Sequence, residues 1–230
     1  MQIFDVGKME NELHARGYSR VKGILNDQTC DAMRTAYDEE RRYRKTIVME
    51  RYRFGLGEYK YFNYPLPEII QEIRTEMYQV LAPVANEWMT KLNIQRRYPA
   101  SHEKFLDECA RNQQEKATVL ILKYGEGGYN CLHQDLYGDI YFPIQVVLFL
   151  SEPGQDYSGG EFVLTEQIPR AQSKVSVINP AKGDMLVFTT NFRPMKGSKG
   201  YYRVNMKHGV SEISSGRRFT LGIIFHDAKT

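Results

Sequence analysis

Apolar and polar positions follow different periods in the two halves of the chain. After Pro65 to Pro67, apolar residues recur every three or four positions, which predicts one long amphipathic helix with a kink at Pro83. From residue 117 onward, apolar residues come instead in short blocks separated by turns that contain glycine or proline, a pattern typical of β-strands. The apolar positions of the predicted helix are Ile69, Ile70, Ile73, Met77, Val80, Leu81, Val84 and Trp88.

Further elements are expected before residue 117. Gly17 is placed to end a short helix over residues 7–15, and Asn26 or Asp27 to cap a helix that continues to about Arg44. The pattern also predicts a helix over residues 101–112. Strands are expected over residues 18–24 and 55–62.

Eight strands are expected in the second half, which favours a sandwich or a jelly roll. We therefore predict an α+β fold in which N-terminal helices pack around a double-sheet β core. Residues 1–230 would form a single domain, with residues 1–116 as mainly helical support and residues 117–228 as the jelly-roll core. The strands are expected over residues 118–124, 131–136, 144–150, 161–165, 175–178, 185–189, 203–209 and 217–225.

Composition narrows the class of protein. Hydrophobic residues make up 42% of the chain and charged residues 26%, which is ordinary for a globular domain and excludes a disordered or fibrous protein. Residues 1–10 lack the apolar core of a secretory signal, and no later apolar run is long enough to span a membrane. The three cysteines are odd in number and widely spaced, so a disulfide framework is not expected. We expect a cytoplasmic protein.

The net charge of +3 is small, but basic residues are concentrated in two segments. Residues 41–60 hold seven basic residues against two acids, and residues 189–209 hold five basic residues and no acid. Such segments attract anionic partners, although a solvated basic surface is the simpler interpretation.

The residues with the most distinctive chemistry are His133 and Asp135, which are two positions apart in a predicted strand. Side chains at that spacing point the same way and can bind one metal ion together. His208, shortly before the last strand, is the candidate third ligand. Two histidines and one carboxylate form the facial triad typical of non-haem Fe(II) oxygenases. Cys131 shares this face by the same period and would favour zinc as a ligand, although a packed thiol is the simpler interpretation.

Arg218 opens the last predicted strand, ten positions after His208. Thr220 shares its face of that strand, whereas Arg217 and Phe219 point to the other side. A guanidinium beside a hydroxyl is suited to bind a carboxylate. Arg218 and Thr220 are therefore candidates for anchoring a co-substrate.

With these residues in place, the chain resembles the Fe(II)/2-oxoglutarate-dependent oxygenases, in particular the prolyl-4-hydroxylase-like branch. The resemblance covers about residues 117–228. Within this superfamily, the sequence motifs are similar to those of a bacterial group, Oxygenase-NA, labelled as acting on damaged DNA. It extends into the first half through residues 57–62 and 64–67. The matching runs are Tyr124 to Gly127, His133 to Gly138, Gly159 to Glu166, Lys182 to Phe188, His208, and Gly216 to His226.

The resemblance implies a double-stranded β-helix, a jelly roll of the cupin kind, that holds Fe(II) on His133, Asp135 and His208. It implies 2-oxoglutarate and O2 as co-substrates, with succinate and CO2 as products. Arg218 would bind the far carboxylate of 2-oxoglutarate, with Thr220 beside it, and Tyr124 would either donate to 2-oxoglutarate or only pack. The expected reaction is hydroxylation, or dealkylation through a hydroxylated intermediate.

The primary substrate is left open between an alkylated nucleobase in DNA or RNA and a small metabolite such as an amino acid. A third possibility is a binding module that keeps the fold without the chemistry. The expected rims of the site are residues 137–142 and the loop over residues 191–202. Of the remaining candidates for ligands, His14, His226 and Asp227 are predicted to lie on the surface. His102 is expected to be a surface residue or the neighbour of a helix cap.

Overall fold

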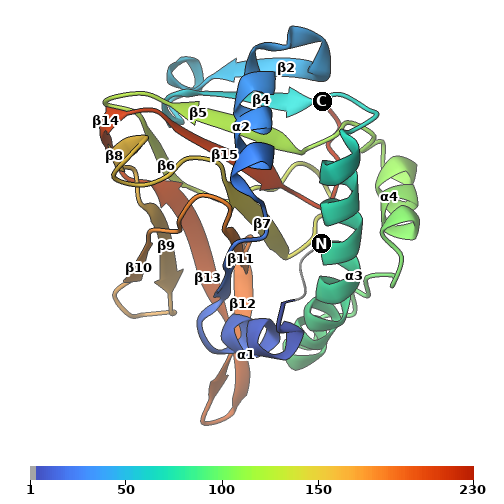
Figure 1. Cartoon of the computed structure of the whole chain (residues 1–230). Helices are drawn as coiled ribbons and strands as arrows, with labels where there is room; N and C mark the ends of the chain where they lie inside the picture. Colours follow the sequence, from blue (N-terminus) through green and yellow to red (C-terminus); the bar gives the residue numbers. More distant parts are fainter. Residues whose placement is uncertain (1–3) are drawn as a thin grey trace.

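Two stacked antiparallel sheets form the core of the computed structural model, which describes residues 4–230 (Figure 1). The first three residues of the N-terminal segment discussed above lie outside the described residues. The helices are α1 (Val6–Arg16), α2 (Asp27–Thr35), α3 (Glu68–Lys91) and α4 (His102–Arg111), with three short 3-10 helices η1 (Ala36–Asp38), η2 (Glu40–Arg42) and η3 (Met49–Tyr52). The strands are β1 (Tyr18–Val21), β2 (Tyr43–Val48), β3 (Gly55–Leu56), β4 (Glu58–Phe62), β5 (Leu120–Tyr124), β6 (Tyr129–His133), β7 (Ile144–Phe149), β8 (Tyr157–Gly159), β9 (Phe162–Gln167), β10 (Lys174–Ile178), β11 (Met185–Thr189), β12 (Phe192–Gly197), β13 (Gly200–Val210), β14 (Ile213–Gly216) and β15 (Arg218–Ile223).

The larger sheet has the order β1-β11-β7-β15-β5-β4-β2 and the smaller one the order β10-β9-β13-β6-β3, with β12 beside β13 and a separate β14-β8 pair. Apolar residues on one face of the larger sheet pack against α1, α2, α3 and α4 and form the main core. The opposite face meets the smaller sheet around Val147, Phe149, Leu164 and Met206. The predicted α+β fold with a double-stranded β-helix is therefore confirmed.

Local sequence explains most helix ends. Asn26 caps α2 by accepting a hydrogen bond from the backbone N–H of Thr29, and Gly17 ends α1 in the left-handed conformation, as predicted. The predicted extension of α2 to about Arg44 is wrong. The chain leaves α2 after Thr35, passes through η1 and η2, and joins the larger sheet as β2, because pairing with β4 satisfies its backbone there.

Residues 55–62 form two strands rather than the single strand expected. Gly57 lies between them with a φ of 151°, and a Cβ there would lie 2.8 Å from the Tyr124 ring. This break sends β3 to the smaller sheet, beside β6, and β4 to the larger sheet, beside β5. The segment therefore crosses from one sheet to the other at the end where the two sheets meet.

The second half holds eleven strands instead of the eight expected. The three additional strands are β8, β12 and β14. Residues 191–202, expected as a loop at the rim, are the turn and arms of the β12–β13 hairpin, which projects from the rest of the molecule (Figure 1). Among residues 4–230, no helix combines the length and hydropathy that crossing a lipid bilayer requires.

Candidate metal centre

His133, Asp135 and His208 lie together between the two sheets. Their potential ligand atoms are all within 4.8 Å of one another. Nε2 of His133 lies 3.6 Å from one carboxylate oxygen of Asp135, and Nε2 of His208 lies 3.3 Å from the other. The two imidazole rings are 4.2 Å apart between centroids. The structure thus brings together the three residues that the sequence selected as candidate ligands.

The last residue of β6 is His133, which lies directly opposite His208 on β13. The ladder shifts register between His208 and Val210, so that two residues of β6, Cys131 and Leu132, lie opposite one residue of β13. Nδ1 of His133 is 2.7 Å from the carbonyl oxygen of Cys131. Because a carbonyl only accepts, Nδ1 carries the proton, and Nε2 keeps its lone pair for a metal.

The same bulge breaks the period-two argument for Cys131. Its thiol is exposed, so Cys131 is not the packed thiol expected from the sequence. It also does not belong to the candidate metal cluster. An extra residue in a strand reverses the facing of the side chains that precede it, so period two fails across a bulge.

Aromatic residues hold the ring of His208 in place. Phe162 stacks on it at 5.8 Å, and Phe188 meets it edge-on at 4.9 Å. Burial lowers the pKa of His208, which keeps its imidazole neutral near pH 7, the form that binds metals. Val204 and Met206 share the buried face of β13 with His208, as the sequence predicted.

Asp135 is held by two donors that the sequence did not reveal. The Tyr137 hydroxyl donates to one carboxylate oxygen at 2.7 Å, and the Gln145 amide donates to the other at 2.8 Å. Burial alone would raise the pKa of Asp135, but the two imidazoles and the Tyr137 hydroxyl outweigh it and hold that pKa well below its usual range. The carboxylate is therefore ionised and fixed in orientation.

A cavity of about 360 Å³ opens onto these residues, within the range of about 300–1,000 Å³ usual for small-molecule sites. Its charged lining side chains, besides the histidines, are Arg53, Asp135 and Arg218, and most of the rest are aliphatic or aromatic. Tyr137 from the predicted 137–142 rim lines it, whereas no residue of the 191–202 segment does.

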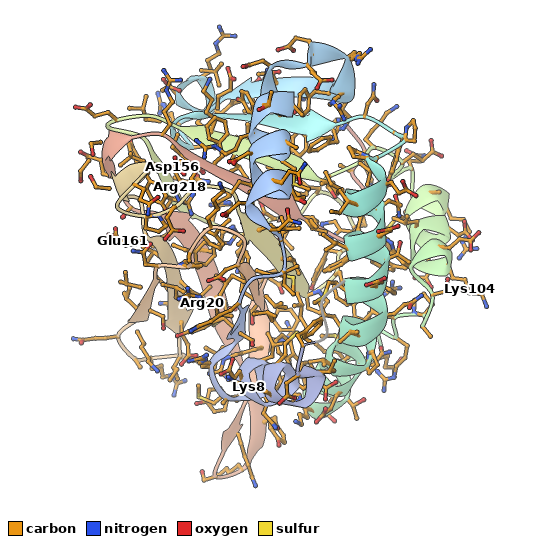
Figure 2. The ribbon with its side chains drawn as sticks, viewed as in Figure 1. Lys8, Arg20, Lys104, Asp156, Glu161 and Arg218 are labelled. Atoms are coloured by element: carbon orange, nitrogen blue, oxygen red, sulfur yellow. The ribbon has the colours of Figure 1, made fainter. Side chains whose placement is uncertain are left out.

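Arg218 lies at the start of β15 (Figure 2) and lines the same cavity. It is only 1% exposed, and its Nε and Nη1 atoms have no hydrogen-bond partner. The rings of Tyr124, Phe149 and Tyr157 surround the guanidinium at 5.4–5.9 Å, and no carboxylate of residues 4–230 forms an ion pair with it. A buried cation without a counter-ion is costly, so this position is built to receive an anion.

Thr220 and Tyr124 occupy the positions the sequence suggested for them. Thr220 is buried, shares the face of Arg218 and lines the cavity, whereas Phe219 packs on the opposite side with the helices. Tyr124 lies directly opposite Arg218 in the ladder, and its hydroxyl accepts a hydrogen bond from Asn130 at 3.3 Å. Both side chains therefore border the space in front of Arg218.

The predicted surface positions are wrong for His226 and Asp227. His226 and Asp227 are buried, because the segment after β15 passes beneath α3, where Arg74 donates to Asp227 at 2.8 Å. His102 directly follows Ser101, the N-cap of α4, as expected, but it is buried and bonds the carbonyl of Phe225. His14 is partly covered, and its Nδ1 accepts a hydrogen bond from Trp88. None of the four belongs to the candidate metal cluster.

Comparisons with known sequences place the chain in a family. Residues 57–228 match the sequence profile of Oxygenase-NA, described as "Oxygenase, catalysing oxidative methylation of damaged DNA". Two strains of Mycobacterium tuberculosis carry uncharacterised proteins that are 44% identical over 167 residues, which is 73% of this chain and 72% of each relative. This identity and coverage place the chain and these relatives in one family.

Solved structures share the fold at low sequence identity. A Pseudomonas putida prolyl-4-hydroxylase superposes with a TM-score of 0.59 at 15% identity, covering 98% of this chain and 100% of that one. An oxidoreductase of the 2OG-Fe(II) oxygenase family from Burkholderia pseudomallei gives 0.59 at 12% identity, covering 99% and 93%. With the profile match over most of its length, the chain belongs to the Oxygenase-NA family of oxygenases.

Proposed function

We propose that the protein is an Fe(II)- and 2-oxoglutarate-dependent dioxygenase. His133, Asp135 and His208 would bind the metal, and Arg218 would bind the far carboxylate of 2-oxoglutarate, with Thr220 and Tyr124 beside it. Membership of an oxygenase family supports this assignment, and the Burkholderia pseudomallei protein of the same fold is described as a 2OG-Fe(II) oxygenase.

The observation that carries the proposal is Arg218, a buried cation with two free N–H groups in the same cavity as the three candidate ligands. A guanidinium binds a carboxylate through two parallel hydrogen bonds. A dicarboxylic keto acid would place one carboxylate on Arg218 and its keto-acid end towards the metal position. A cavity with metal ligands alone would not need this cation.

The donor set fits Fe(II), since it combines two imidazoles with one hard carboxylate and leaves the remaining positions open. When bound, Fe(II) supplies the activation of O2 that is coupled to conversion of 2-oxoglutarate to succinate and CO2. The chain's own residues provide the geometry. Tyr137 and Gln145 fix the Asp135 carboxylate, Cys131 fixes the tautomer of His133 through its carbonyl, and the aromatic rings around His208 exclude water.

The lining of the cavity supports a nucleobase as primary substrate more than an amino acid. An α-amino acid needs an anion for its ammonium group and a cation for its carboxylate. Once Asp135 and Arg218 are engaged, the lining drawn from residues 4–230 offers no further carboxylate and only Arg53 as a cation. Flat, uncharged rings fit the remaining aromatic surface of Phe54, Tyr59 and Tyr137. The description of the family also names DNA.

We further propose that the whole chain acts as a single catalytic unit, with residues 117–228 as its core. Strands β1, β2 and β4 of the first half extend the larger sheet, and β3 pairs with the strand that ends in His133. The cytoplasmic location expected from the cysteine count stays a prediction.

The test begins without oxygen. Titrating the Fe(II)-loaded protein with 2-oxoglutarate is expected to produce a visible metal-to-ligand charge-transfer band, and admitting O2 is expected to yield succinate. Succinate formation should then be stimulated by a single-stranded oligonucleotide carrying N-alkylated bases and not by free amino acids. Absence of both the band and succinate in folded, iron-loaded protein would refute the enzyme assignment. Stimulation by an amino acid alone would reassign the substrate.

A further inference from the structure

A pair of exposed aromatic rings stands at the mouth of the cavity. Tyr52 is 52% exposed and Phe54 is 46% exposed, and their rings stack at 5.4 Å with an angle of 18° between the planes. Phe54 and its neighbour Arg53 line the same cavity as His133 and Arg218. We call residues 51–54 the aromatic ridge. Single exposed hydrophobic residues are common, whereas adjoining exposed rings rimmed by polar residues mark a binding surface.

The ridge is held rigidly against the metal-ligand strand. Arg53 adopts the left-handed conformation, and the backbone N–H of Phe54 donates to the carbonyl of Met49, which is fully buried beneath the ridge. The carbonyl of Phe54 in turn accepts a hydrogen bond from the backbone N–H of Cys131 at 2.8 Å. Cys131 lies two residues before His133, so the position of the ridge is fixed relative to the candidate metal ligands.

The charge of the ridge is positive. Arg51 and Arg53 are exposed, and no carboxylate among residues 4–230 forms an ion pair with either side chain. Lys45, in the same basic segment, is also exposed and without such a partner. By contrast, Arg193 in the second basic segment is buried and paired with Glu166 at 2.5 Å, and Lys60 is buried beside Glu40. The other basic residues of the second segment are exposed, but they do not line the cavity: Lys196, Lys199, Arg203 and Lys207. Of the exposed cations in the two basic segments, Arg53 lines the cavity, and Arg51 lies two positions before it beside Tyr52.

We propose that the aromatic ridge binds single-stranded nucleic acid, with the base next to the reacting one stacked on the Tyr52–Phe54 pair and flanking phosphates on Arg51 and Arg53. This inference rests on the proposed nucleobase substrate and names the strand state that the enzyme would take. Unpaired bases present the faces that aromatic side chains stack on, and arginine supplies the phosphate contact. Bases in an intact duplex have no such free faces at this position.

Fluorescence anisotropy with a labelled oligothymidylate of roughly a dozen nucleotides tests the inference, since a single-strand site usually covers about 4–16 nucleotides. Wild-type protein is expected to bind this probe more tightly than the same strand paired with oligoadenylate. Tyr52→Ala should weaken binding about 5- to 150-fold, the usual range for losing one base stack. Tyr52→Trp should retain or improve binding, because the larger ring keeps the stacking face.

The matched control is Tyr201→Ala, which removes a tyrosine that is 41% exposed, against 52% for Tyr52, from the projecting β12–β13 hairpin. It should leave the affinity unchanged. Arg51→Gln should weaken binding and reduce the slope of log affinity against log salt by about 0.7, the value for one phosphate on a single strand. Tyr52 does not line the cavity, so Tyr52→Ala should bind 2-oxoglutarate as the wild type does.

Two outcomes would overturn the inference while leaving the oxygenase proposal intact, because 2-oxoglutarate binding is measured separately. One is equal or tighter binding of the duplex by the wild type. The other is an equal effect of Tyr52→Ala and Tyr201→Ala. If a polyglutamate probe binds the ridge and the oligonucleotide does not, the partner is an acidic protein segment and the inference is also wrong. Failure of the wild-type protein to bind 2-oxoglutarate would instead refute the proposed function.

Discussion

Replacing Arg218 by methionine removes the proposed anchor of 2-oxoglutarate while keeping a long side chain in the space. Arg218 is almost completely buried, and its Nε and Nη1 groups have no hydrogen-bond partner among residues 4–230. The surrounding rings of Tyr124, Phe149 and Tyr157 form an apolar wall that methionine can pack against. The substitution therefore changes ligand binding more than packing.

The size of the effect follows from those two groups. A hydrogen bond to a charged group contributes about 1.5–3 kcal/mol, so losing two of them should cost about 3–6 kcal/mol of binding free energy. With about 1.4 kcal/mol for each tenfold change, the Kd for 2-oxoglutarate should rise about 10²- to 10⁴-fold. Arg218→Lys should fall between wild type and methionine, because an ammonium keeps the charge but loses the planar fork.

Anaerobic calorimetric titration of the Fe(II)-loaded protein measures this affinity directly. Thermal unfolding provides the control for folding. The apo Arg218→Met protein should unfold at the same temperature as the wild type or higher, because the substitution removes an uncompensated buried charge. Saturating 2-oxoglutarate should raise the Tm of the wild type and leave that of the variant almost unchanged.

The assignment of this residue would be refuted if Kd for folded Arg218→Met rose less than about threefold. The expected rise is about 10²- to 10⁴-fold, which corresponds to about 3–6 kcal/mol. The same conclusion would follow if the apo variant lost several kcal/mol of stability, since that would show an internal role for the guanidinium. Loss of affinity together with a Tm equal to or above that of the wild type would support the anchor.

Three further predictions concern the metal ligands and buried histidines. Asp135→Ala should abolish Fe(II) binding and succinate formation, and stoichiometric iron in the purified variant would contradict this. Tyr137→Phe should weaken metal affinity about 10- to 100-fold, because it removes one of the two donors that orient the carboxylate, and an unchanged Kd for Co(II) would show that the hydroxyl is dispensable. Burial lowers the pKa of His102 and of His226 from 6.5 to about 3. Below pH 6.5 the unfolded chain therefore binds more protons than the folded protein. As the pH falls from 7 to 5, each of these histidines should lower the free energy of unfolding by about 2 kcal/mol. In urea denaturation, His102→Gln should remove its own share of that loss, and pH profiles that are parallel in variant and wild type would disprove this origin.

Local rules were sufficient wherever a residue's neighbours in sequence are also its neighbours in space. The three- and four-residue spacing predicted α3, and Asn26 and Gly17 marked the ends of their helices. Period two placed Arg218 and Thr220 on one face of β15, and Val204, Met206 and His208 on one face of β13. In these strands no bulge intervenes between the residues compared.

The same rules failed where the tertiary structure decides burial. Asp227 follows the last strand and looked exposed, yet Arg74 and Tyr64 from distant parts of the chain pair with it. Cys131 lost its predicted facing to a bulge that only the partner strand β13 reveals. Helix α2 ended early because pairing with β4 draws the following residues into the larger sheet.

For the site, the sequence by itself determined which residue types could bind a metal and an anionic co-substrate, because His133, Asp135, His208 and Arg218 carry that chemistry in any environment. Only the tertiary structure decided that Gln145 and Tyr137 orient the carboxylate, that Arg218 has no counter-ion within residues 4–230, and that the aromatic ridge borders the cavity. These properties depend on distance and burial between segments remote in sequence, and local periodicity carries no information about either.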